Sequence, residues 1–213
     1  MFLLCGIFLD SHPLIINFQF FIRTNLQHLQ EIEIPKLIKY IKKHVLLKMG
    51  ITVPRISTRG YYDLSTGKTL KTNSYFLYPK KSFDNLSSSK EVTIMIHGLR
   101  NDNAGAIAKV VLAKNRLKKL GYSHPVIGYS YDSNTTGAHL LKHAKHSLAV
   151  GQIIAKKNGQ NLGKFIEDFK IKNPKIKIRL IGHSLGSQVI LSTVEYLSKK
   201  KQNKGIIESI YFF

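Results

Sequence analysis

The sequence predicts an α/β domain, residues 49–213, built on a mostly parallel sheet flanked by helices. Three apolar runs of strand length, 92–96, 126–131 and 176–181, alternate with longer segments of helical periodicity. This alternation is typical of a parallel sheet with right-handed helical crossovers. The third run leads directly into a Gly-x-Ser-x-Gly motif, and a further helical pattern follows the motif.

Composition excludes several classes of protein. The chain of 213 residues is 43% hydrophobic, which is typical of a folded domain and not of a disordered one. Its single cysteine, Cys5, excludes an intrachain disulfide. Lys and Arg number 33 against 12 Asp and Glu, a formal charge of +21 that attracts polyanions non-specifically. Because the lysines are spread along the chain and arginine is scarce, we interpret the charge as a solvated basic surface and expect no specific nucleic-acid partner.

The first 48 residues differ from the rest and are predicted to be an N-terminal apolar and basic helical extension. Residues 1–22 are apolar, but Asp10 and Pro13 interrupt the run, and it lacks a basic start and a small-residue cleavage site. We therefore do not predict a membrane span or a signal peptide, although a degenerate signal or anchor stays open. The expected location is the cytoplasm.

Residues 26–48 have the periodicity of a helix with one apolar stripe and lysines elsewhere. Two interpretations stay open: a packing helix with a wet basic face, or weak contact with an anionic membrane surface. Met49 could be an alternative start, which would make the extension an appendage.

The segments before the first crossover are predicted as follows. Two β segments, 51–62 and 75–78, are joined by a polar turn over residues 63–68, and residues 81–90 form a polar loop. The continuous apolar strand 92–96 is of the kind that is buried on both faces. A helix follows, with Gly121 just beyond its end. Its predicted core face comprises Ile107, Val110, Val111, Leu117 and Leu120.

After strand 126–131 the chain has a long helical stretch in which Gly159 is the predicted break. Asn173-Pro174 closes it. After strand 176–181 and the motif, another helix is followed by a polar run, and residues 206–213 are predicted to be a fourth strand of this series. The predicted core faces of the two helices comprise Leu162, Phe165, Ile166 and Phe169, and Val189, Ile190, Thr193, Val194 and Leu197.

The Gly-x-Ser-x-Gly motif predicts a nucleophile elbow, a sharp strand-to-helix turn that presents the hydroxyl of Ser184 above the sheet. Gly182 and Gly186 suit it because a serine in a strained turn leaves no room for side chains two residues away. A serine nucleophile also needs donors for the oxyanion that forms on its substrate. We predict that these are the backbone N–H groups of Leu185, at the start of the helix, and of Leu99.

The carboxyl ends of parallel strands meet at one edge of a sheet, where ligands bind. His97-Gly98-Leu99 and Asp132 each follow a predicted strand, so we expect them to lie near Ser184. His97, Gly98 and His183 are predicted to support the loop and the elbow, and Asp132 is a candidate pocket residue or helix cap.

With these motifs the chain resembles the α/β-hydrolase superfamily. Residues 178–187 match the lipase/esterase serine signature, and segments 54–60, 97–99 and 124–132 look like a group of archaeal α/β hydrolases of mostly unassigned substrate. The resemblance covers about residues 51–213. It implies an α/β-hydrolase fold, with Ser184 as nucleophile.

The chain departs from the family that it resembles in two catalytic groups, the acid and the histidine that acts as the base. Family members place the acid after a later strand and the histidine after the last one, and no histidine or aspartate follows Ser184. Both groups would lie beyond Phe213, so we expect the chain to be the N-terminal part of a longer reading frame. We therefore assign neither the acid nor the base.

Other histidines are weak substitutes for the base. The neighbour of the nucleophile, His183, is expected to shape the turn, and His97 to be structural. His139, His143 and His146 are predicted to share a helix face at i, i+4 and i+7, but no nearby carboxylate completes a zinc set, so no metal site is predicted. An Asp132–His139 pair serving Ser184 is the one catalytic triad that can be drawn within the chain.

The sequence thus predicts a serine hydrolase that cleaves an ester or other acyl bond of a small-molecule substrate through an acyl-enzyme on Ser184, with no cofactor. The alternative is a non-catalytic, truncated or degenerate fold that acts as a binding or membrane-surface module.

Overall fold

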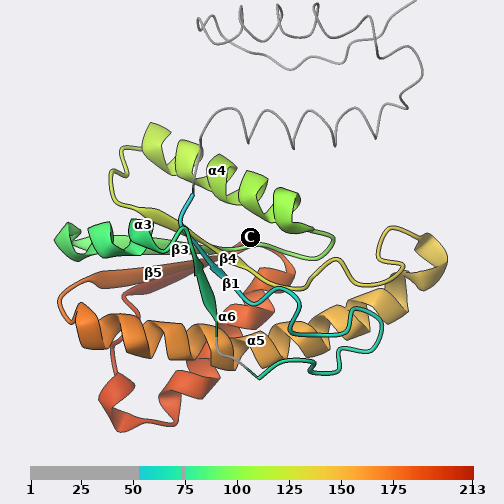
Figure 1. Ribbon diagram of the computed structural model, residues 1–213. Helices are drawn as coiled ribbons and strands as arrows, with labels where there is room; N and C mark the ends of the chain where they lie inside the picture. The colour runs from blue at the N-terminus through green and yellow to red at the C-terminus, as the bar shows by residue number, and fades with distance from the viewer. Residues whose placement is uncertain (1–52, 73–74) are drawn as a thin grey trace, which may run out of the picture. The chain divides into compact units, whose positions relative to one another are not determined.

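A computed structural model describes residues 53–72 and 75–213. The predicted extension of residues 1–48, with its 26–48 helix, lies outside these ranges. The described chain forms one six-stranded sheet with the order β2-β1-β4-β3-β5-β6 (Figure 1). All neighbouring strands are parallel except β1 and β2, which confirms the predicted fold class. The strands are β1 (Arg55–Ser57), β2 (Phe76–Tyr78), β3 (Glu91–Ile96), β4 (Val126–Ser130), β5 (Lys177–Gly182) and β6 (Ser209–Phe212).

Helices cover both faces of the sheet. Helix α4 (Asn103–Lys119) lies on one face, and α5 (Ala144–Lys172) and α6 (Leu185–Ser198) lie on the other (Figure 1). Shorter helices are α3 (Lys81–Asp84), η2 (Asn85–Ser88), η3 (Leu141–His143) and η4 (Lys201–Asn203). Within the described ranges, no helix is both long and apolar enough to cross a bilayer.

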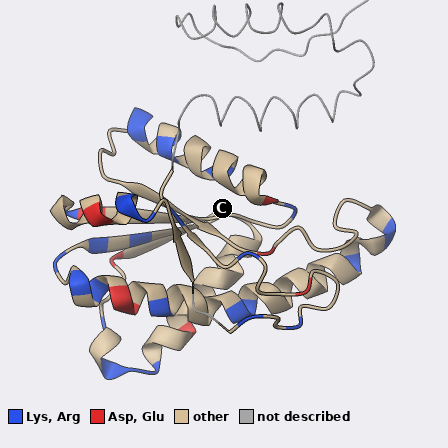
Figure 2. Cartoon of the chain, in the orientation of Figure 1, with Lys and Arg blue, Asp and Glu red and all other residues tan. Residues whose placement is uncertain are grey.

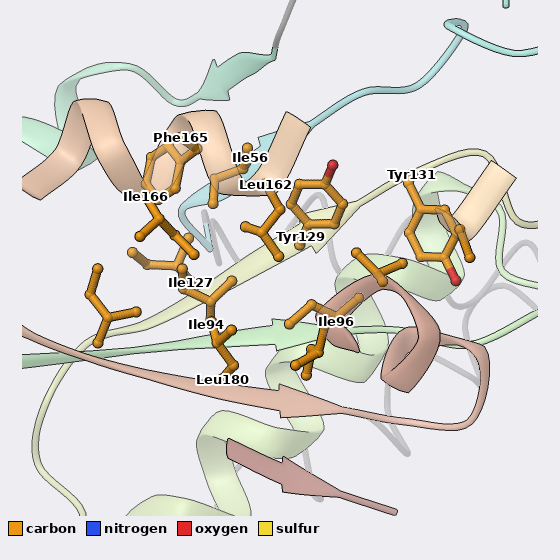
Figure 3. Close-up of a cluster of buried hydrophobic side chains, with 14 of the residues drawn as sticks. Ile56, Ile94, Ile96, Ile127, Tyr129, Tyr131, Leu162, Phe165, Ile166 and Leu180 are labelled. Carbon is orange, nitrogen blue, oxygen red and sulfur yellow. The ribbon is translucent and has the colours of Figure 1, made fainter. Parts of the chain in front are cut away.

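The larger core lies between the sheet and the α5–α6 layer. Leu162, Phe165 and Ile166 of α5 point at strand residues such as Ile127 and Leu180 (Figure 3). The predicted apolar face of the second half of α5 is therefore confirmed. A smaller cluster under α4 contains Met95, Val110 and Ile181. The central strands are buried from both sides, as their continuous apolar sequences require.

The predicted break at Gly159 is wrong, because α5 runs without interruption from Ala144 to Lys172. Gly159 lies where α5 meets α6, and a Cβ atom there would collide with the side chain and backbone of Ser192. Gly163, one turn later, faces the ring of Tyr196 in the same way. These glycines allow close helix contact, and sequence alone does not distinguish that role from a helix break.

Two smaller predictions are also corrected. Residues 81–88, most of the predicted polar loop 81–90, form α3 and η2, where Leu86 is buried and Phe83 packs edge-on against Phe165. Leu120 is 83% exposed and does not belong to the core face of α4, which ends one residue earlier. Val194 is likewise partly exposed on α6.

The topology brings two loops together. After β3 the chain crosses through α4 to β4, on one side of β3, and then returns through α5 to β5, on the other side. Strands β3 and β5 are therefore neighbours, with Ile96 paired with Gly182 at their carboxyl ends. This reversal of direction is the position at which open α/β sheets bind ligands.

Candidate active site

Ser184 occupies the strand-to-helix turn between β5 and α6. Its backbone has φ 52° and ψ −120°, a strained conformation for a residue other than glycine, and its side chain is exposed. Its own N–H donates to the carbonyl of Phe213 at 2.8 Å. The predicted elbow geometry is present, with the hydroxyl at the edge of the sheet.

The two motif glycines are sterically required. A Cβ on Gly182 would lie 2.8 Å from Ile190 Cδ1 and 2.9 Å from the amide nitrogen of Ser187. A Cβ on Gly186 would overlap the carbonyl of Ile96 and lie 2.9 Å from that of His97. The neighbours of Gly186 are backbone atoms of β3 and its following loop, which cannot move aside as a flexible side chain can.

The loop after β3 lies directly against the elbow. A Cβ on Gly98 would lie 3.0 Å from Ser184 Cβ, 2.9 Å from the carbonyl oxygen of His183 and 3.0 Å from His183 Nδ1. The half-buried ring of His183 thus supports the loop, and burial, with the charge of Lys109, lowers its pKa. Among the described residues, its Nδ1 has no hydrogen-bond partner.

His97 is a fully buried structural residue. The N–H of Tyr131 donates to its Nε2 at 3.2 Å, which assigns the ring proton to Nδ1, and Nδ1 lies 3.0 Å from the carbonyl of Gly98. The ring also stacks on Tyr131, with 4.6 Å between centroids. Burial, reinforced by the charge of Arg59, lowers its pKa to about 3, so the ring is neutral.

Two residues that sequence reasoning missed hold this loop. Asn101 is buried and its Nδ2 donates to the carbonyls of Gly98 and Leu99 at 3.0 and 2.9 Å. Arg59, from the segment after β1, donates to Ser130 Oγ at 2.7 Å and to the carbonyls of Asn101 and Asp102, each at 3.0 Å. Asn101 could have been suspected from its place beside Leu99, whereas Arg59 is brought there only by the fold.

These bonds fix where the Leu99 N–H points. In a trans peptide the C=O and the following N–H point in opposite directions. Because the Gly98 carbonyl faces Asn101 and His97, the Leu99 N–H faces away from them. Among the described residues neither this N–H nor that of Leu185 has a hydrogen-bond acceptor. The loop is further constrained at Arg100, which has φ 64° and donates its N–H to Ser133 at 2.9 Å.

The side chains of the two predicted donors meet on helix α5. A Cβ on Gly151 would lie 2.7 Å from Leu99 Cδ1 and 3.1 Å from Leu185 Cδ2. Both residues therefore rest against one bare stretch of α5 backbone. Nothing in the local sequence around Gly151 signals this, since it is one glycine within a helical pattern.

Asp132 lies at the carboxyl end of β4, and its carboxylate binds backbone N–H groups of the segment after β1. Its carboxylate accepts the N–H groups of Gly60, Tyr61 and Tyr62 at 3.0, 3.0 and 3.1 Å. It makes no hydrogen bond to His139, whose Nε2 lies 2.9 Å from Asn134 Oδ1. The Asp132–His139 pair drawn from the sequence is therefore absent from the described structure.

The predicted helix face of three histidines is wrong. His139 precedes η3, His143 is the last residue of η3, and His146 belongs to α5. The ring of His146 contacts the carbonyl of Ser65 at 3.1 Å, in the turn after β1. Within residues 53–72 and 75–213, no three His, Cys, Asp or Glu side chains are grouped to hold a metal.

The best-formed cavities do not coincide with this chemistry. One of about 810 Å³ lies between the end of α6 and the start of β6, lined by residues such as Leu197 and Ile206. That is the opposite edge of the sheet from Ser184. The candidate site is therefore assigned by the elbow at Ser184 and the loop held against it, and not by cavity size.

Comparison with known proteins gives one family. A family model described as an alpha/beta hydrolase of unknown function (DUF900) matches residues 80–213, which include β3, the elbow and all of α4 to β6. No curated protein and no solved structure matches the chain.

Proposed function

Since the chain belongs to the DUF900 family of alpha/beta hydrolases of unknown function, we propose that it is a serine hydrolase acting on an ester or other acyl bond. One observation carries the proposal. Ser184 stands exposed in a strained elbow, and Gly98 of the neighbouring loop is held against it. Structures store such strain where a catalytic group must be presented in a fixed position.

In the proposed reaction Ser184 Oγ attacks the acyl carbon, and its proton passes to a base and then to the leaving group. The carbon–heteroatom bond of the substrate breaks and leaves an acyl-enzyme, which water hydrolyses. The amides of Leu185 and Leu99 donate to the oxyanion. Removing one such donor in other enzymes slows the reaction by about 10²- to 10³-fold.

The base is not assigned. Within the described ranges no histidine hydrogen-bonds to Ser184 Oγ, and the rings of His97 and His139 are engaged elsewhere. This observation favours a second candidate function, a binding module that keeps the elbow without catalysis. The two candidates differ in whether the Ser184 hydroxyl is activated.

Covalent labelling separates them. The purified chain is treated with a fluorophosphonate, and its intact mass is measured beside that of Ser184→Ala and Ser187→Ala. We expect wild type to gain one phosphonyl group with loss of fluoride. Ser187→Ala, which removes another hydroxyl of the same turn, gains it too, and Ser184→Ala gains none.

If Ser184→Ala is labelled as fast as wild type, Ser184 is not the nucleophile. If a wild-type chain whose fold is verified by circular dichroism stays unlabelled, the Ser184 hydroxyl is not activated within this chain, and the proposed acyl transfer does not occur in it.

A further inference from the structure

The segment between β4 and α5 exposes leucines to solvent. Leu140 is 50% exposed, Leu141 in η3 is 92% exposed, and Leu148 in the second turn of α5 is 44% exposed. Because η3 leads directly into α5, the exposed Leu141 is followed within about two helical turns by Lys145 and Leu148, which are also exposed. We call Leu140, Leu141, Lys142, Lys145 and Leu148 the 140–148 surface.

This surface lies at the same edge of the sheet as the candidate site. It follows the carboxyl end of β4, and in Figure 1 η3 and the start of α5 lie beyond the ends of the strands. Gly151, the eighth residue of α5, meets the side chains of Leu99 and Leu185. The 140–148 surface therefore continues outward from the helix that supports the candidate site.

The exposure of these leucines does not come from a loosely held segment, because hydrogen bonds fix the backbone around them. Thr135 Oγ1 donates to the Ser147 carbonyl at 2.9 Å, and Ser147 Oγ donates to the Thr136 carbonyl at 2.7 Å. Ala138 is buried, and the N–H of Leu140 donates to the Gly137 carbonyl at 2.9 Å. These bonds hold the apolar side chains outward in a fixed arrangement, which is unusual unless something covers them.

The charge around the surface has one sign. From residue 133 to residue 166 the chain contains five lysines and no aspartate or glutamate. Lys142 and Lys145 are exposed and lie between the leucines in the sequence. Figure 2 shows blue at the outer end of this segment, without red. The adjoining turn does carry Asp63, whose carboxylate accepts the N–H groups of Ser65 and Thr66.

We infer that the 140–148 surface is a docking surface for an anionic lipid membrane. Leucines enter the boundary between headgroups and acyl chains, while lysines reach lipid phosphates with their apolar stems lying along the same surface. A nucleic acid complements the lysines but gains nothing from exposed leucines. An anionic membrane complements both kinds of side chain.

Docking in this way places the edge of the sheet that carries Ser184 toward the bilayer. If the proposed hydrolase function holds, its substrate class is then an amphipathic lipid ester drawn from the membrane. This clause rests on the proposed function, whereas the membrane contact does not. Ser184→Ala is therefore expected to bind vesicles as wild type does.

The test is sedimentation of the full chain with two kinds of vesicle. One is phosphatidylcholine alone, and in the other about one lipid in three is phosphatidylserine, which is anionic. We expect binding to the anionic vesicles only. Leu140→Ser/Leu141→Ser should lower the partition coefficient about tenfold, because apolar insertion sets part of the affinity. Lys142→Gln/Lys145→Gln should lower it too and weaken its dependence on salt.

The control is Leu120→Ser, which removes a leucine that is 83% exposed just beyond the end of α4. It should leave partitioning unchanged. The inference is overturned if the full chain does not bind anionic vesicles, or if the double leucine variant binds as tightly as wild type. The second outcome would assign the contact to other basic segments, such as residues 26–48, or to charge alone.

Discussion

Leu99, from the loop after β3, and Leu185, the first residue of α6, rest their side chains on the same residue, Gly151 of α5. Their backbone N–H groups are the two proposed oxyanion donors, so one helix position contacts the side chains of both donor residues. A methyl group at Gly151 would meet Leu99 Cδ1 first, at 2.7 Å. Contacts this short force neighbouring atoms to shift.

We predict that Gly151→Ala displaces both donors. Alanine gains up to about 1 kcal/mol of helix propensity, while overpacking costs about 1–3 kcal/mol, so the net loss of stability is small. The amide resonances of Leu99 and Leu185 should shift most in a ¹H–¹⁵N spectrum. Labelling of Ser184 by a fluorophosphonate should slow about tenfold, a modest part of what a lost oxyanion donor costs.

Gln152→Ala, an exposed change at the next position of α5, is the control and should alter neither measurement. Leu99→Ala in the Gly151→Ala background should restore the Leu185 resonance toward its wild-type position. Unchanged amide resonances in Gly151→Ala would show that Gly151 does not position the donors.

A second prediction concerns the protonation of His97. Burial lowers its pKa from 6.5 to about 3. Below pH 6.5 the unfolded chain takes up a proton at this residue that the folded chain refuses, so stability falls as the pH drops from about 6.5 toward about 3. One such group contributes a slope of up to about 1.4 kcal/mol per pH unit.

The direct measurement is a ¹H NMR titration of the His97 ring between pH 7.5 and pH 4.5 (about three pH units, all of them above the folded pKa). Its ring resonances should stay constant while the protein is folded. A titration midpoint near that of free histidine would contradict the buried, neutral ring, and with it the hydrogen bond from Tyr131 that positions the loop.

The sequence is enough to predict the alternating strands and helices and the elbow, because these depend on local periodicity and on one short motif. Strands β3, β4 and β5 each lie within a residue or so of the predicted runs. Local patterns do not distinguish a glycine that breaks a helix from a glycine that lets a second helix pack closely against the first. The sequence around Gly159 predicts a break in α5, yet Ser192 of α6, 33 residues later in the sequence, occupies the space beside it.

The hydrogen-bond partners of buried polar side chains also cannot be predicted from the sequence. Asp132 follows a strand, as a catalytic acid does, but its partners are N–H groups some 70 residues earlier in the chain. Arg59 likewise joins β4 to the loop after β3. Such pairings depend on the order of strands in the sheet, with β1 next to β4, and periodicity carries no information about that order.

The third prediction tests whether Asp132 is structural. In Asp132→Asn one acceptor oxygen becomes an NH₂ group that faces a backbone N–H, so at least one of three hydrogen bonds is lost. We expect the free energy of unfolding in urea to fall by about 1–3 kcal/mol. At a temperature where the variant is folded, Ser184 should still be labelled at close to the wild-type rate.

His139→Ala is the matched test of the pair drawn from the sequence, and it should change neither quantity measurably. A large loss of labelling in both variants, with little change in stability, would instead restore Asp132 and His139 as an acid–base pair.

The last prediction concerns Gly186, in the first turn of α6. On helix propensity alone, Gly186→Ala should stabilise the helix by up to about 1 kcal/mol. The space is occupied, however, by the carbonyls of Ile96 and His97, which belong to the backbone of β3 and its loop. Because backbone atoms cannot rotate away, α6 must shift from the sheet, and we expect a net destabilisation of about 1–3 kcal/mol in urea.

Leu191→Ala, at an exposed position of the same helix, should change stability by less than about 0.5 kcal/mol. If Gly186→Ala were as stable as this control, the second glycine of the motif would be explained by something other than close packing. The tight contact between elbow and loop, which brings Gly98 within reach of Ser184, would then lose its main support.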